Sequence, residues 1–157
     1  MKISDFRLSA HLFSIDIDYK LQDYYVNFDT WTEEQQWEKI IQEGQKILEE
    51  IQNVRPHDEA RICSHLPSSY FFQGHFSQAL IYAERCSRTA ETIKNTELFL
   101  KGLYLQSASY RGLAGKQKEW LQEEFYKKAV ELCEKALMIY TEKKQLAKAY
   151  WQKFILI

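Results

Sequence analysis

The chain has 157 residues and a net charge of −1, and 45% of its residues are hydrophobic and 27% charged. This length fits one domain with its own apolar core, and five glycines and two prolines are too few for the many tight turns of an all-β protein. The charge is uneven, because residues 1–59 carry −7 and residues 60–157 carry +6. Since the acidic half would repel phosphates, we do not expect a nucleic-acid-binding protein.

Residues 1–31 carry two competing patterns. Residues 15–21 alternate apolar and polar side chains with a period of two, which is typical of a half-buried strand. A longer series recurs every three or four residues, which is typical of a helix. It comprises Phe6, Ala10, Phe13, Ile17, Leu21, Tyr24 and Phe28. We favour the helix over a β-hairpin, because a lone strand needs a partner and only residues 24–28 could supply one.

The next helix is expected to begin at Thr32. This threonine precedes Glu33, Glu34 and Gln35, an order that predicts an N-cap followed by two carboxylates at the positive end of a helix. The helix should continue to about Gln52. Residues 53–56 should end it, because the residue before a proline avoids helical geometry.

Residues 57–72 predict the first helix of a second pair, with Pro67 in its middle. Either the helix begins near Pro67 or it kinks there. Residues 73–75 contain Gly74 and predict a turn into a helix over residues 76–94. A further helix should begin near Thr96 and end at about residue 113, between Gly112 and Gly115.

The last third of the chain contains an insertion. Residues 116–124 have no helix breaker and contain good helix formers, so the helix that follows should start early and be extended. A terminal helix is expected over residues 144–154, followed by an apolar end, residues 154–157. Such an end must pack on something, and a homodimer formed through the terminal helix is one solution.

Three segments share one pattern, in which an aromatic residue is followed by an apolar pair and, seven positions later, by a small residue. They begin at Trp37, Phe76 and Tyr126. A helix with such a small-residue stripe can bury its apolar face by stacking on its own copies. The pattern therefore predicts an all-α protein built as a short solenoid.

The segment Gly74-x-Phe76-x-x-Ala79-Leu80-x-Tyr82-x-Glu84-x-Cys86 resembles the turn and second helix of a tetratricopeptide repeat. Residues 129–140, continuing into residues 146–150, are similar to the longer repeats of regulatory scaffolds. The resemblance covers roughly residues 57–157. It implies a right-handed solenoid of about three helical hairpins in one domain, with repeat units at residues 32–56, 57–95 and 96–143 and a terminal helix at 144–157. It also implies that the chain binds another protein or peptide.

Partner-binding residues are expected among aromatic and basic side chains on the first helix of each hairpin. The candidates are Tyr70, Phe72, Tyr104, Tyr110, Arg111 and Lys148. Some tetratricopeptide domains hold a carboxylate with Lys, Asn and Arg at set positions. The required asparagines are missing here, so that clamp is not carried over.

Enzymatic chemistry is not expected. Asp16-x-Asp18 offers only two carboxylates and Cys63-x-His65 lacks a second ligand pair, so neither predicts a metal site, and no cofactor motif is present. A hydrolase that uses Cys63 and His65 is the enzymatic alternative. It would need a positioned base and oxyanion donors, of which the sequence gives no sign.

The three cysteines, Cys63, Cys86 and Cys133, are odd in number and far apart, which is typical of a reducing compartment. An early Asp5 stands where the apolar core of a secretion signal would begin, and no apolar run approaches a membrane span. We therefore expect a cytoplasmic protein without a membrane partner. Two narrower hypotheses share the fold: an immunity or antitoxin-like protein, and a chaperone dedicated to one secreted partner.

Overall fold

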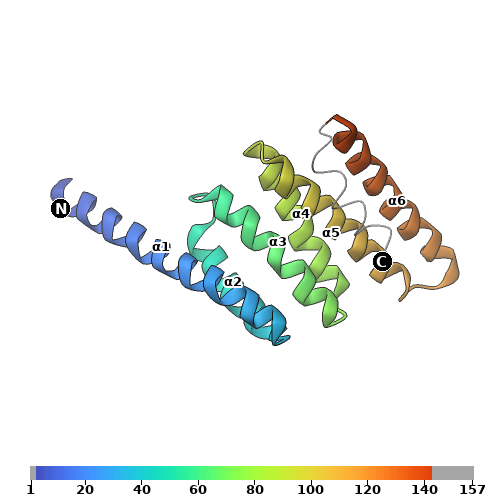
Figure 1. Ribbon diagram of the computed structural model, residues 1–157, viewed down its shortest axis with the longest axis horizontal. Coiled ribbons are helices and arrows are strands. Elements are labelled where there is room, and N and C mark those ends of the chain that lie inside the picture. Colours follow the sequence, from blue (N-terminus) through green and yellow to red (C-terminus); the bar gives the residue numbers. More distant parts are fainter. Residues whose placement is uncertain (1–2, 143–157) are drawn as a thin grey trace.

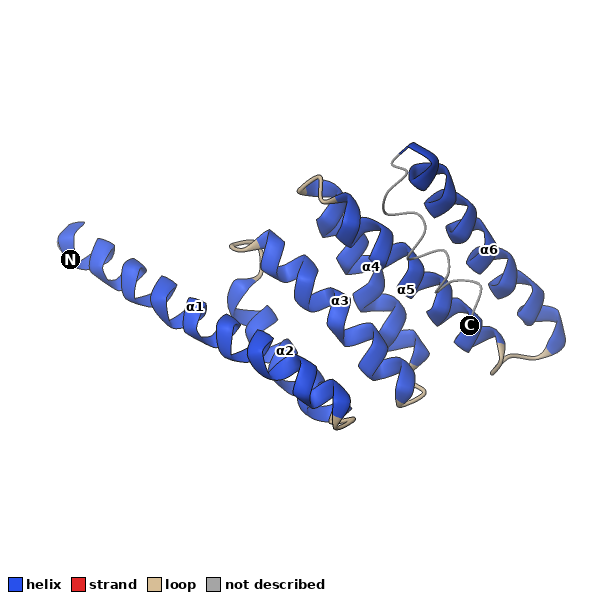
Figure 2. Cartoon of the chain, in the orientation of Figure 1, coloured by secondary structure: helices blue, strands red, loops and turns tan. Residues whose placement is uncertain are grey.

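The computed structural model of the chain describes residues 3–142, and this part of the chain is all-helical (Figures 1 and 2). The expectation of an all-α protein is confirmed. Short turns join the helices, which are α1 (Ile3–Glu33), α2 (Trp37–Ile51), α3 (Pro56–Phe72), α4 (Phe76–Thr92), α5 (Thr96–Ala114) and α6 (Glu119–Glu142).

Each helix packs against the next one in the chain, and α3 also contacts α5. Figure 1 shows α3 to α6 side by side and α1 extending at its N-terminal end well beyond α2. The arrangement follows from the short turns, because helices joined by a few residues must be antiparallel neighbours. The expected terminal helix, its apolar end and the homodimer contact lie outside the described residues.

Three of the turns have the same backbone conformation. Gln35, Gly74 and Lys94 each stand two residues before a helix and have φ values of 57°, 75° and 56°. The residue after each donates its N–H to a carbonyl five positions back, at 2.8, 2.9 and 2.9 Å. This is the Schellman arrangement, in which glycine is preferred at the left-handed residue. Gln35 therefore occupies the position that Gly74 fills in the second copy of the pattern.

This equivalence gives a matched pair of substitutions. We expect Gln35→Gly to raise the free energy of unfolding by about 0.5 kcal/mol. Glycine adopts positive φ without strain, and this gain is larger than the loss from the greater conformational entropy of glycine in the unfolded chain. Gly74→Ala should lower it by about 1 kcal/mol; the nearest atom to the new methyl group is the flexible Lys116 Nζ at 3.5 Å, so φ dominates. Urea denaturation of both variants measures the two free energies of unfolding. A change of the same sign and size in both would contradict the equivalence of Gln35 and Gly74.

The N-terminal helix agrees with the favoured reading of residues 1–31 and corrects one expectation, the helix start at Thr32. Residues 3–33 form one helix, so the β-hairpin alternative is wrong. Thr32 does not cap a new helix, since α1 runs through it and its hydroxyl donates to the Phe28 carbonyl at 2.8 Å. The helix expected to start at Thr32 starts at Trp37, after the turn that contains Gln35.

Proline positions also differ from expectation in α3. Pro56 was expected only to end a helix, but it begins α3, where a first-turn proline loses no hydrogen bond. The helix does not begin near Pro67; it passes through Pro67 to Phe72. At the other end of the chain, α6 begins at Glu119, which confirms the early start of the extended third helix.

The main core lies between α1, α2, α3 and α4. Its most buried large side chains include Ile17, Tyr24, Ile40 and Leu66. Small residues let the helices approach, as predicted: Ala83 is fully buried, whereas Cys133 is only half-buried. A second cluster joins α5 to α6 and contains Leu100, Leu103, Ala136 and Tyr140.

Candidate protein-binding groove

Two apolar hollows flank α5 and share three of its residues. The first has a volume of about 290 Å³ and lies between α3 and α5. The second, of about 150 Å³, lies between α5 and α6. Tyr104, Ala108 and Arg111 line both, so the hollows form one groove across α5. The walls are Pro67, Ser68, Phe71 and Phe72 of α3 and Tyr126, Ala129, Val130 and Cys133 of α6.

The groove exists because the middle of α5 carries small side chains. Ser107, Ala108 and Ser109 fill little space, and the hydroxyls of the two serines form hydrogen bonds within the protein. Ser107 Oγ donates to the Ala129 carbonyl at 3.1 Å and Ser109 Oγ donates to the Leu105 carbonyl at 2.7 Å. The Ser107 bond joins α5 to the backbone of α6, while the surface beside Ala108 stays hollow.

Arg111 is the charged group of the groove. Among the described residues it forms no ion pair with a carboxylate. Burial raises the pKa of the neighbouring Tyr104 phenol, and the Arg111 charge opposes that rise. Burial likewise raises the pKa of the Cys133 thiol, against the smaller effects of its Ser107 hydrogen bond and of Arg111. A guanidinium beside neutral groups is suited to an acidic partner group.

Three of the predicted partner-binding residues come together in this groove: Phe72, Tyr104 and Arg111. Phe72 is 65% exposed although its ring stacks on Trp37 at 4.8 Å. Such an exposed ring at the wall of a hollow offers apolar contact area to a partner.

The other predicted residues lie elsewhere. Tyr70 packs between helices, because its ring stacks on Tyr82 at 5.6 Å and its hydroxyl accepts a hydrogen bond from Gln45 at 2.8 Å. Tyr110 lies at the α5–α6 seam, where it stacks on Phe125 at 6.0 Å. Lys148 lies outside the described residues.

Two aromatic residues of the groove, Phe71 and Tyr126, were missed from the sequence, as were its small and aliphatic lining residues. A signal existed for Tyr126, since it opens the third copy of the pattern, like Trp37 and Phe76. Those two rings are covered by contacts with Phe72 and Phe71, whereas Tyr126 is 47% exposed.

The Cys63–His65 pair has no catalytic geometry. Both side chains are buried, and burial raises the pKa of Cys63 to about 12 and lowers that of His65 to about 3. Residues two apart on a helix point to different sides, and His65 stacks on Phe28 with ring centroids 3.7 Å apart. A protonated thiol and an inaccessible imidazole give the hydrolase alternative no support.

Within residues 3–142, no three histidine, cysteine or acidic side chains gather as they would around a metal ion. No helix of that same stretch combines the length and apolarity needed to cross a membrane. Comparison with protein families finds no match, and no curated protein or solved structure matches the chain either.

Proposed function

We propose that the chain is a tetratricopeptide-like protein-interaction module, with no enzymatic activity of its own, that holds a segment of a partner protein in the groove across α5. One observation carries this proposal: a guanidinium without a carboxylate partner among the described residues lies between two apolar hollows, beside an exposed phenylalanine.

The chemistry of the groove defines the partner segment. Apolar side chains of that segment would enter the hollows beside Phe72 and Tyr126, and an acidic group would bind Arg111. Aromatic rings and arginine are the side chains that most often dominate binding energy at protein interfaces. Tyr104 and Ala108 form the floor that both hollows share.

Capture experiments test this function. The wild-type chain is used to capture proteins from its source cell, and the partner is identified by mass spectrometry. We expect Arg111→Glu and Phe72→Ala each to weaken binding of the purified partner by about tenfold or more, because each removes a central contact. Ile81→Ala is the matched control, since Ile81 is 60% exposed on α4 and lies outside the groove.

The identity of the captured protein separates the narrower hypotheses. One dominant toxin indicates an immunity protein, whereas a secreted client indicates a dedicated chaperone. If both groove variants bind the captured partner as tightly as Ile81→Ala does, the groove is not the binding site.

A further inference from the structure

Helix α1 has two apolar faces, of which only one belongs to the core. The core face includes Ile17, Leu21 and Tyr24, each at most 4% exposed. The other face carries Leu12, Ile15, Tyr19 and Val26, which are 57%, 51%, 73% and 68% exposed. At 3.6 residues per turn these four lie within a sector of about 60°, about 180° from the core face.

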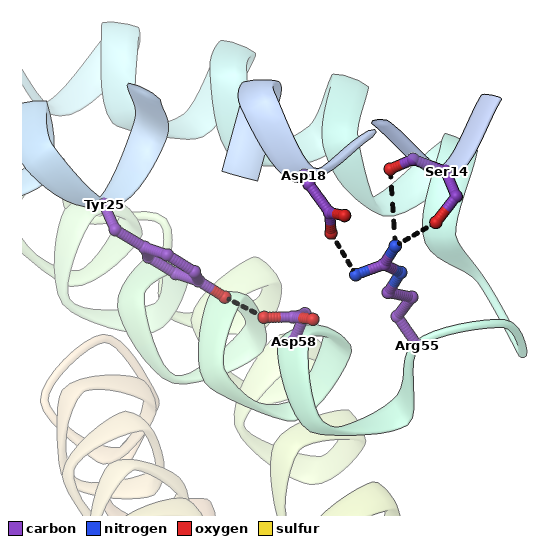
Figure 3. Close-up of polar contacts among 5 residues, drawn as sticks. All are labelled: Ser14, Asp18, Tyr25, Arg55 and Asp58. Atoms are coloured by element: carbon purple, nitrogen blue, oxygen red, sulfur yellow. Dashed lines mark hydrogen bonds and ion pairs between the residues drawn. The ribbon is translucent and has the colours of Figure 1, made fainter. Parts of the chain in front are cut away.

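Polar contacts of α1 fix which face is turned outward. Figure 3 shows Arg55, in the turn before α3, reaching Asp18 and Ser14 of α1. It also shows the Tyr25 hydroxyl donating to Asp58 of α3 at 2.8 Å. On another side, Lys20 Nζ lies 2.9 Å from Glu50 Oε2 of α2. These contacts hold α1 by the sides next to its core face, so the outer stripe stays uncovered by the described residues.

The outer stripe has the spacing of a coiled-coil seam. Leu12, Ile15, Tyr19, Gln22 and Val26 follow one another at intervals of three, four, three and four residues. This is the alternation by which a helix presents a continuous seam to a second helix. A single polar residue in such a seam, here Gln22, fixes the register of pairing. Lone exposed apolar residues are ordinary, but a seam of this spacing is typical of a helix-binding surface.

Charge decides what binds there. Asp16 pairs with Lys20, and Asp18 pairs with Arg55. Asp23 and Asp29 lie on opposite flanks of the stripe, and neither forms an ion pair with a described residue. The stripe is therefore apolar with negative flanks. Two copies of α1 paired along it would bring negative flanks together, and an anionic membrane surface would repel it.

We propose that the outer stripe of α1, formed by Leu12, Ile15, Tyr19, Gln22 and Val26, is a second interaction surface that binds an amphipathic helix with basic flanks. This surface is separate from the groove across α5. The chain would thus hold two segments at once, an acidic one in the groove and a basic helix on α1. Coiled-coil pairing over about two heptads is short, so an affinity in the micromolar range is expected.

Two synthetic helices test the proposal. Both carry leucine at the seam positions of about three heptads, one with lysine and the other with glutamate at the flanking positions. Fluorescence anisotropy with the full chain should show the lysine peptide binding about tenfold or more tightly than the glutamate peptide. Leu12→Ser combined with Tyr19→Ser should weaken binding of the lysine peptide by about tenfold, because the double substitution removes two seam contacts. Ile81→Ser, at an exposed position of α4, is the matched control and should have no effect.

Charge reversal gives an independent readout. Asp23→Lys combined with Asp29→Lys should reverse the preference toward the glutamate peptide, while circular dichroism shows an unchanged helix content. Equal affinity for both peptides in the wild-type chain would overturn the proposal. So would sedimentation showing that the chain alone forms a dimer that the Leu12→Ser and Tyr19→Ser changes dissociate, since the occupant would then be a second copy.

Discussion

Gly102→Ala is expected to lower the free energy of unfolding by about 3 kcal/mol. Gly102 of α5 lies against the backbone of α4, where an added methyl group would stand 2.7 Å from Ser87 N and 2.9 Å from Ser87 Cα. Neither atom belongs to a flexible side-chain end, so the two helices would have to separate. Separation would also break the buried hydrogen bond that Gln106 Nε2 donates to Ser87 Oγ at 2.7 Å. The gain from alanine's higher helix propensity, about 1 kcal/mol, is too small to compensate.

Gly115→Ala is the control for this result. Gly115 is the C-cap of the same helix, has a φ of −63°, and has no atom closer than 3.7 Å to the added methyl group. Gly115→Ala should change the free energy of unfolding by no more than about 0.5 kcal/mol. Chemical denaturation followed by circular dichroism measures both variants. Equal stability of the two would show that α4 and α5 are not in close contact at Gly102.

Acid is expected to destabilise the protein through His65. The imidazole is buried among Tyr24, Tyr25 and Phe28 of α1, and its Nδ1 has no hydrogen-bond partner. Burial lowers its pKa from 6.5 to about 3, and the charges of Lys101 and Arg61 add to the effect. Between these values the unfolded chain binds a proton that the folded chain does not. Stability is therefore complete above pH 6.5 and decreases as the pH falls, by roughly 3 kcal/mol at pH 4.

The variant His65→Phe isolates this effect, because the ring remains and the titration is lost. Urea denaturation at several pH values should show the difference in stability between the variant and the wild-type chain changing by roughly 3 kcal/mol from pH 7 to pH 4. The other ionisable groups are common to both chains and cancel in the difference. A flat difference for His65→Phe would refute the assignment.

Helix positions were predictable where pattern and turn signals agreed. Gly74 and the pattern starting at Phe76 gave the beginning of α4 correctly. The beginning of α2 was missed because Thr32 has the sequence of a cap, but the aromatic series of α1 keeps the backbone helical through it. The turn lies three residues further on, at Gln35, where glutamine has a conformation that sequence rules assign to glycine. Burial of the aromatic side chains of α1 thus outweighed the capping preference of the sequence around Thr32.

The groove was predictable only in part, for a geometric reason. Sequence places a residue on a helix and gives its angle relative to its neighbours on that helix. The sequence does not say which other helices cover the side of the helix on which that residue lies. Phe72, Tyr104 and Arg111 face a hollow, whereas Tyr70 and Tyr110 have similar chemistry but meet Tyr82 and Phe125. The exposure of Tyr126 depends on what covers α6, which its own repeat pattern does not encode.

The chain-order packing of the helices also determines how a disturbance spreads. Because each helix rests mainly on its neighbours in the chain, with further contacts between α3 and α5 and between α1 and α3, cooperativity is transmitted stepwise along the row. A change that weakens the α5–α6 seam reaches α1 through α3, which contacts both α5 and α1. Because the outer stripe of α1 faces away from the core, it and the groove across α5 can bind their partners with little thermodynamic coupling, and occupancy of one need not alter affinity at the other.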